Sequence, residues 1–236
     1  LLSHPAAFLD AMTSINRKWE NWFELQTERR KKWVEDWENH LLKEEIENSK
    51  SNRKMHPLQL GVDIISEMND EDWLVFDGGN THFWNEIAVN ISGWRGKKLG
   101  GIMHPGNYSL LGVGISFGIS AKAAYPDKNV VVISGDGAFL SGGLSIESAF
   151  QEGLPIIVVI DNNGGLDCIS QQQERLFANG QHYATDFRDI PFHTMFEGLG
   201  GYGELVTTRS ELKPALARAI KSLSLIHISE PTRHAS

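Results

Sequence analysis

Two stretches of the sequence decide the fold. Residues 130–138 read Val-Val-Val-Ile-Ser-Gly-Asp-Gly-Ala, and residues 156–165 read Ile-Ile-Val-Val-Ile-Asp-Asn-Asn-Gly-Gly. Each begins with a continuous run of β-branched residues, which is typical of a strand buried on both faces of a parallel sheet. Each run ends in glycine with aspartate or asparagine, residues that turn a chain. The sequence therefore predicts two buried strands with polar, glycine-rich ends.

Outward from these stretches, strands alternate with helices between His56 and Ser222. Residues 73–77 form another apolar run, which ends in Asp77-Gly78-Gly79-Asn80, and residues 204–207 form a weaker one. Helical stretches of about fifteen residues separate the runs, which is the βαβ arrangement. We expect an α/β fold, a doubly wound parallel sheet with helices on both faces, preceded by a long helical segment. Ligands bind such sheets beyond the carboxyl ends of the strands, so the glycine-rich ends predict one shared site.

The chemistry of these ends suits a phosphate group and a metal ion. The Gly135–Ala138 turn lets backbone N–H groups approach an anion, and the following helix adds its partial positive charge. The Asp136 carboxylate would repel that anion unless a cation lay between them. Asn163 adds an amide oxygen and Gly164-Gly165 add carbonyls, and Mg²⁺ prefers such oxygen ligands together with phosphates. Residues 77–81 are expected to supply further hydrogen-bond donors.

The plainer alternative is that these residues only turn the chain. For a lone Gly-Asp-Gly we would favour that alternative. Here Gly-Asp-Gly and Asn-Asn both end strands, and the 24 residues between Gly137 and Asn162 fit one helix and one strand. Their joint placement favours the binding site.

Composition narrows the classes of partner. The chain has 236 residues, 41% of them apolar, which suffices for a core. Its net charge of −8 argues against a nucleic-acid partner, and no apolar run approaches the ~20 residues of a membrane span. Cys168 is the single cysteine, so no internal disulfide can form, and a reducing, cytoplasmic location is expected.

Residues 6–50 are expected to form a long helix, because they contain neither glycine nor proline. Apolar and aromatic residues recur on one face at helical spacing, namely Ile15, Trp19, Trp22, Trp33, Trp37 and Leu41. A nucleic-acid or partner surface is one interpretation, but we favour an aromatic face that docks on a neighbouring domain. A polar break over residues 49–54 separates this helical linker, residues 1–55, from the domain at 56–222.

The two ends of the chain look incomplete. Residues 223–233 read Leu-Ser-Leu-Ile-His-Ile-Ser-Glu-Pro-Thr-Arg, which is the in-frame translation of a transposon-type sequencing adapter. We therefore expect residues 223–236 to be a non-native tail outside the fold, and an ordinary polar tail is the alternative. Leu1 opens the chain with neither an initiator methionine nor a signal-peptide pattern, so we expect a fragment.

The motifs resemble a known family. Gly135-Asp136-Gly137, a spacer of this length and Asn162-Asn163 resemble the diphosphate-binding motif of thiamin-diphosphate enzymes. The resemblance runs from about residue 56 to 222 and includes residues 77–81, 106–114 and 151–155. This order is similar to the C-terminal cofactor domain of the acetolactate synthase, benzoylformate decarboxylase and 2-hydroxyacyl-CoA lyase group. Residues 1–55 are similar in position to the segment that leaves the group's middle domain.

The resemblance implies a role for each matching residue. The Asp136 and Asn163 side chains and the Gly165 carbonyl would bind Mg²⁺. The diphosphate would accept hydrogen bonds from residues matched on two strand ends, namely Gly137, Ala138, Gly79, Asn80 and Thr81. Leu111 would lie under the cofactor and force its two rings into a V, with Ser109 C=O and Leu111 N–H on the aminopyrimidine edge. Without the family, Leu111 could equally be a core residue.

His82 and His104 lie close to these strand ends and could face a substrate. A structural role is the interpretation that we favour for both. No residue of this chain is assigned a catalytic role from the sequence.

The resemblance also implies a reaction that makes or breaks a C–C bond beside a carbonyl. Acetolactate-synthase-like condensation or decarboxylation of 2-oxo acids is our first choice, because residues 173–177 are similar to that branch. Residues 166–168, Leu-Asp-Cys, depart from it. A 2-hydroxyacyl-CoA lyase or an oxalyl-CoA-type decarboxylase, with a 2-hydroxyacyl substrate, is the alternative.

The group activates its cofactor with a glutamate on an N-terminal, pyrimidine-binding domain of a partner subunit, and nothing here resembles that domain. We therefore expect part of a homodimer or homotetramer, with little activity alone. The alternative from another class is a non-catalytic nucleotide-binding module. The sequence favours it less, since no Gly-x-Gly-x-x-Gly follows the first strand and no Gly-Lys-Ser/Thr motif occurs.

Overall fold

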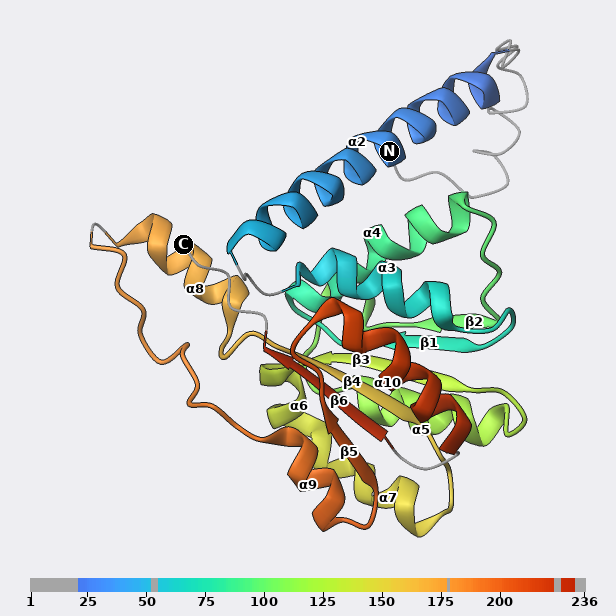
Figure 1. Cartoon of the computed structure of the whole chain (residues 1–236), viewed down its shortest axis with the longest axis vertical. Coiled ribbons are helices and arrows are strands. Elements are labelled where there is room, and N and C mark those ends of the chain that lie inside the picture. Colours follow the sequence, from blue (N-terminus) through green and yellow to red (C-terminus); the bar gives the residue numbers. More distant parts are fainter. Residues whose placement is uncertain (1–20, 52–54, 178, 223–225, 232–236) are drawn as a thin grey trace, which may run out of the picture. The chain divides into compact units, whose positions relative to one another are not determined.

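The computed structural model describes residues 21–51, 55–177, 179–222 and 226–231 (Figure 1). The chain divides into two units, residues 1–40 and 41–236, and each is described by itself. The described part of the first unit belongs to helix α2 (Trp22–Ser51), which continues into the second unit. Within the first unit, Trp33 and Trp37 meet edge to face with ring centroids 6.3 Å apart. The expected long helix is confirmed from Trp22, and residues 6–20 lie outside the described ones.

The second unit is built on one parallel sheet. Its six strands are β1 (Trp73–Phe76), β2 (Gly101–Met103), β3 (Val130–Gly135), β4 (Ile157–Asn162), β5 (Tyr202–Leu205) and β6 (Ile226–Pro231). They lie in the order β2-β1-β3-β4-β6-β5, and every neighbouring pair is parallel. The chain leaves β1 toward β2 on one side and reaches β3 on the other, so the direction of winding reverses between β1 and β3. Such a switch point is where open α/β sheets bind ligands.

The central strands carry the core. Val132 lies opposite Val158 in the pairing of β3 with β4, and both side chains are fully buried. Because side chains alternate along a strand, Val130 and Val132 share one face of β3, where they pack with Phe139 and Ile146. A continuous β-branched run therefore serves both faces of the sheet, as the sequence predicted.

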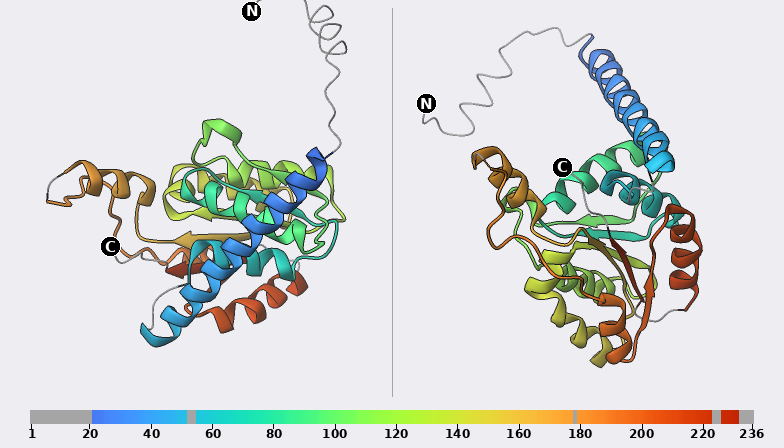
Figure 2. Two further views of the ribbon diagram at one scale, coloured as in Figure 1. Left: turned by 90° about the horizontal axis from the view of Figure 1, so that it is seen from above. Right: turned by 60° about the vertical axis from the view of Figure 1, so that its left-hand side comes forward.

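Helices cover both faces. One layer holds α3 (Pro57–Glu67), α4 (Asn80–Trp94) and α10 (Arg209–Ser222), and the other holds α5 (Gly114–Ala124), α6 (Asp136–Gly142), α7 (Ile146–Gln151) and α9 (Phe192–Gly198). Figures 1 and 2 show the sheet between these layers, with α8 (Asp167–Leu176) beside them. The expected doubly wound α/β fold is confirmed. Among the described residues, no helix combines the length and apolar character needed to cross a bilayer.

Two strands were not predicted. β2 is only three residues long, and such a segment carries almost no pattern. Residues 226–231 were expected to lie outside the fold, and this was wrong, because they form β6 between β4 and β5. The physical reason is that Ile-His-Ile offers β-branched residues to a position where both neighbouring strands can pair with it. The adapter origin of residues 223–236 stays a prediction.

Helix α5 approaches β3 closely at Gly118, where a Cβ atom would lie 2.4 Å from Val132 Cγ2. We expect Gly118→Ala to force the helix from the sheet and lower the free energy of unfolding by about 1–3 kcal/mol, as overpacking does. Urea unfolding measures this change. Gly198→Ala is the matched control, because a Cβ there meets nothing within 4 Å. Equal effects of the two substitutions would contradict the close approach.

Candidate functional site

Three helices begin at neighbouring carboxyl ends of the sheet. Asn80 opens α4 after β1, Asp136 opens α6 after β3, and Asp167 opens α8 after β4. All three residues line one cavity of about 240 Å³. A helix N-terminus carries partial positive charge and free N–H groups, so this end of the sheet attracts an anion.

The structure brings together all ten residues that the sequence singled out for cofactor or metal binding. They line this single cavity: Gly79, Asn80, Thr81, Ser109, Leu111, Asp136, Gly137, Ala138, Asn163 and Gly165. The shared location follows from the parallel sheet, whose strand ends meet at one edge. The individual role of each residue stays a prediction.

Asp136 joins the ends of β3 and β4. Its side chain is 2% exposed; Oδ1 accepts the Gly137 N–H at 2.7 Å, and Oδ2 accepts those of Gly164 and Gly165 at 2.8 and 2.9 Å. Burial raises the pKa of this carboxyl from 3.8 to about 6, and the three N–H groups oppose the rise only in part. A divalent cation beside the carboxylate would counter the rise, because it stabilises the charged form.

The turn after β4 packs against residues 185–187. The Gly165 N–H also lies 3.1 Å from Asn163 Oδ1, and the Phe187 N–H donates to the Gly164 carbonyl at 2.8 Å. A Cβ on Gly165 would lie 2.4 Å from the Thr185 carbonyl oxygen, so only glycine fits there. The turn thereby presents Asn163 and Gly165 to the cavity beside Asp136.

Asp77 is a buried acceptor at the end of β1. Oδ1 accepts the N–H groups of Gly78 and Gly112 at 2.8 and 2.9 Å, and Oδ2 accepts the Gly114 N–H at 3.0 Å and the Ser134 hydroxyl at 3.2 Å. The Asp77 carboxylate ties β1 to the start of α5 and to β3.

The loop that Asp77 holds carries Ser109 and Leu111. The backbone of Ser109 adopts the left-handed conformation, with φ of 46°. Its hydroxyl accepts the Gly79 N–H at 2.9 Å. That N–H, expected to face a diphosphate, is thus engaged within the protein. Leu111 is 36% exposed and lines the cavity, which contradicts the alternative that it is a core residue.

Asp167 also lines the cavity, although no role was predicted for it from the sequence. Its Oδ2 accepts hydrogen bonds from Asn80 Nδ2 at 2.7 Å and Gln171 Nε2 at 2.9 Å. It therefore links the starts of α4 and α8 and orients the Asn80 amide. An acidic residue soon after a Gly-Gly strand end is a helix-start signal that could have identified it. His82 and His104, by contrast, do not line this cavity.

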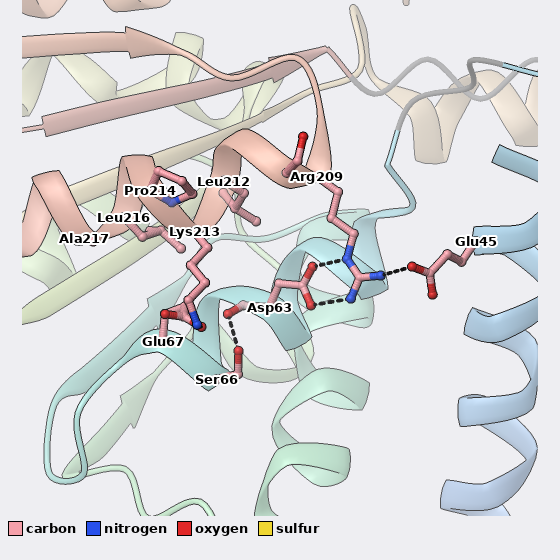
Figure 3. Close-up of a pocket in the computed structure, with 11 residues that line it drawn as sticks. Glu45, Asp63, Ser66, Glu67, Arg209, Leu212, Lys213, Pro214, Leu216 and Ala217 are labelled. Carbon is pink, nitrogen blue, oxygen red and sulfur yellow. Dashed lines mark hydrogen bonds and ion pairs between the residues drawn. The ribbon is translucent and has the colours of Figure 1, made fainter. Parts of the chain in front are cut away.

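A larger cavity of about 850 Å³ lies among α3, α10 and Glu45 of α2 (Figure 3). Arg209 there donates to Asp63 at 2.6 and 3.0 Å and to Glu45 at 2.6 Å. Lys213 pairs with Glu67 at 2.9 Å. The two cations face three carboxylates, so this cavity offers no surplus positive charge for a phosphate.

Comparison with known proteins agrees with the geometry of the smaller cavity. A family model described as thiamine pyrophosphate enzyme, C-terminal TPP binding domain, matches residues 78–228. Acetolactate synthase large subunit IlvG of Mycobacterium tuberculosis is 28% identical over 169 residues, 71% of this chain and 30% of the relative. A 2-hydroxyacyl-CoA lyase of Oryza sativa subsp. japonica is 30% identical over 173 residues, 70% of this chain and 29% of the relative.

Among solved structures, the thiamine diphosphate-dependent 4-hydroxybenzoylformate decarboxylase of Rhodococcus jostii RHA1 has a similar fold. Its TM-score is 0.65 at 24% identity, over 77% of this chain and 33% of that one. The chain thus spans about 30% of the length of the curated relatives that it matches.

Loss of the Asp77 carboxylate should destabilise the domain strongly. Asp77→Ala leaves three backbone N–H groups and a hydroxyl without their acceptor, and each buried unsatisfied donor costs about 1–3 kcal/mol. We expect the free energy of unfolding in urea to fall by at least about 3 kcal/mol. Asp70→Ala, at a side chain 63% exposed, should change it by less than about 0.5 kcal/mol. Similar losses in both variants would contradict the role of Asp77.

Ionisation of Asp136 should weaken the fold when no metal is bound. Its raised pKa means that the folded state keeps the proton to higher pH than the unfolded state. Below about pH 4, the protonated Asp136 carboxyl adds at most about 3 kcal/mol to the free energy of unfolding, relative to high pH. This contribution is lost as the pH rises through 6. The measurement is the difference in unfolding free energy between Asp136→Ala and the unsubstituted chain, in chelator, across this range. A difference that does not vary with pH would contradict the raised pKa.

Proposed function

This chain belongs to the thiamine pyrophosphate enzymes, as their C-terminal TPP-binding domain, and we propose that it holds the diphosphate of thiamin diphosphate through Mg²⁺. The observation that carries the proposal is the convergence of three helix N-termini on a cavity that also contains a buried carboxylate. The helix ends favour an anion, whereas Asp136 requires a cation beside it. A metal–diphosphate complex meets both requirements.

The residues present fit such a complex. Asp136 and Asn163 offer side-chain oxygens from neighbouring strand ends, and the Gly165 carbonyl is the third proposed metal ligand. Ala138 would present its N–H group at the start of α6, together with Asn80 and Thr81 at the start of α4, whereas the Gly137 N–H would first have to leave Asp136 Oδ1. A Cβ at Gly137 would lie 2.5 Å from Leu166 Cδ2, so a larger residue there would displace the Leu166 side chain.

The protein's part in the chemistry is positioning. When bound, thiamin diphosphate supplies the electron sink for making or breaking a C–C bond beside a carbonyl. Leu111 would support the two rings from below, and Ser109 C=O and Leu111 N–H would bind the aminopyrimidine edge. The hydrogen bonds from the Gly112 and Gly114 N–H groups to Asp77 hold the end of the loop that carries these groups.

The cavity is half of a complete site. Its 240 Å³ falls below the ~300–1,000 Å³ of typical ligand pockets. Apolar side chains nearby are exposed, with Tyr108 at 95% and Leu110 at 61%. We infer that a pyrimidine-binding domain of a partner subunit covers them and supplies the activating glutamate. This arrangement needs a homodimer or homotetramer and leaves the chain alone with little activity.

For the reaction, we propose acetolactate-synthase-like condensation or decarboxylation of a 2-oxo acid in the cytoplasm. The relatives of this chain include synthases, lyases and an indole-3-pyruvate decarboxylase. A 2-hydroxyacyl-CoA lyase or oxalyl-CoA-type decarboxylase is the second candidate. Residues 166–168 line the cavity and depart from the acetolactate synthase pattern, and a 2-hydroxyacyl-CoA lyase is among the relatives, at 30% identity.

Calorimetric titration of the chain with thiamin diphosphate tests the proposal. We expect binding that requires Mg²⁺ and that Asp136→Ala weakens by at least about 100-fold, since the substitution removes the charged metal ligand. Asp189→Ala, at an exposed aspartate outside the cavity, should bind as the unsubstituted chain does.

Binding that is independent of Mg²⁺, or that Asp136→Ala leaves unchanged, would contradict the metal-bridged site. Tighter binding of NAD than of thiamin diphosphate would support the nucleotide-binding alternative instead.

A further inference from the structure

A separate group of metal-ligand side chains lies where α4 begins and β2 ends. His82 and Glu86 are one helical turn apart on α4, and His104 directly follows β2. Each offers one ligand atom, and these atoms all lie within 4.8 Å of one another. None of the three residues lines the 240 Å³ cavity, and the function proposed above does not use them.

A buried aromatic ring holds the two imidazoles side by side. The His104 ring stacks on Phe76, with centroids 4.9 Å apart and planes 7° from parallel. The His82 ring lies 5.6 Å from the same Phe76 and 4.8 Å from His104. Since Phe76 is 1% exposed, both imidazoles pack against a ring that is itself fixed in the core, and this contact favours their positions before any ion binds. Such preorganisation lowers the entropy that binding must overcome.

The ligand set selects a class of ion. Two imidazoles and a carboxylate suit Zn²⁺ and its neighbours, whereas Mg²⁺ and Ca²⁺ prefer oxygen ligands alone. His82 Nε2 and Glu86 Oε1 lie 2.9 Å apart, within hydrogen-bond distance. Ligands on a tetrahedral zinc ion lie about 3.3 Å apart, so an ion could replace this hydrogen bond after a small movement of Glu86. Glu86 can move, because its side chain is 53% exposed.

Metal binding would break one existing hydrogen bond of His104. The Gly106 N–H donates to His104 Nδ1 at 3.2 Å, the long end of the range. Binding through Nε2 would move the ring proton to Nδ1, and binding through Nδ1 would displace the N–H directly. In either case, a long hydrogen bond is given up for a metal–nitrogen bond.

We propose that His82, Glu86 and His104 bind a divalent transition-metal ion of the Zn²⁺ type. Three protein ligands leave at least one coordination position for water or a small ligand, as in open zinc sites. The exposed Glu86 side chain gives the ion access from solvent. The site shares no residue with the Mg²⁺–diphosphate cavity, so either proposal can fail without the other.

Zinc titration of the full chain against a chromophoric chelator, in excess Mg²⁺, tests the site. We expect one tightly bound Zn²⁺ per chain, and a loss of affinity of about 100-fold or more in Glu86→Gln and in His104→Asn, each of which removes one ligand. Co²⁺ should give visible absorption bands that both variants lose. Glu86→Gln at an exposed position also guards against a folding artefact, since its thermal unfolding in chelator should be unchanged.

Two controls separate this site from others. His182→Asn removes a histidine that also pairs with two carboxylates, Glu174 and Asp186, and should leave zinc binding unchanged. Asp136→Ala should leave it unchanged too. Zinc affinity that depends on His182 or on Asp136, that survives both Glu86→Gln and His104→Asn, or that is absent at micromolar zinc would overturn the proposal.

Discussion

Two buried carboxylates, Asp77 and Asp136, hold the carboxyl end of the sheet in shape. Between them they accept six backbone N–H groups and one hydroxyl, from loops that would otherwise leave those groups unpaired in the interior. Asp77 fixes the loop before α5, and Asp136 fixes the turn after β4. The two residues differ in where they lie, since Asp136 lines the cavity and Asp77 does not. Asp77 therefore positions a loop beside the cavity, whereas Asp136 also places its carboxylate in the cavity.

That charge is the reason for proposing a metal ion in the site. Three helix N-termini favour an anion, yet Asp136 and Asp167 stand at two of them. Burial already raises the pKa of Asp136, so a bare diphosphate beside it would be repelled or would force its protonation. A cation between the carboxylate and the diphosphate would attract both anions and so offset their mutual repulsion. The same reasoning predicts that the domain contributes the diphosphate half of a site whose remaining walls come from elsewhere.

The sequence predicts what depends on local pattern. Continuous β-branched runs identify the buried strands β3 and β4, and their polar ends, with that of β1, predict eight residues of one cavity, whereas Ser109 and Leu111 were expected there only from the family resemblance. The sequence does not predict hydrogen bonds between residues that lie far apart along the chain. The acceptor role of Asp77 requires residues 112–134 to fold back onto it, and the bond of Asp167 to Asn80 joins residues 87 positions apart. β6 was missed because residues 223–236 were interpreted as an adapter-derived tail and left out of the fold.

The affinity of the chain for thiamin diphosphate relative to thiamin, both in Mg²⁺, tests the central claim most directly. If the chain holds the diphosphate end through a bridging metal, removal of both phosphates should weaken binding by at least about 100-fold, since charge-assisted hydrogen bonds and metal bonds are lost together. The preference should largely disappear in chelator. Equal affinity for the two molecules, or a preference that persists without Mg²⁺, would contradict the account.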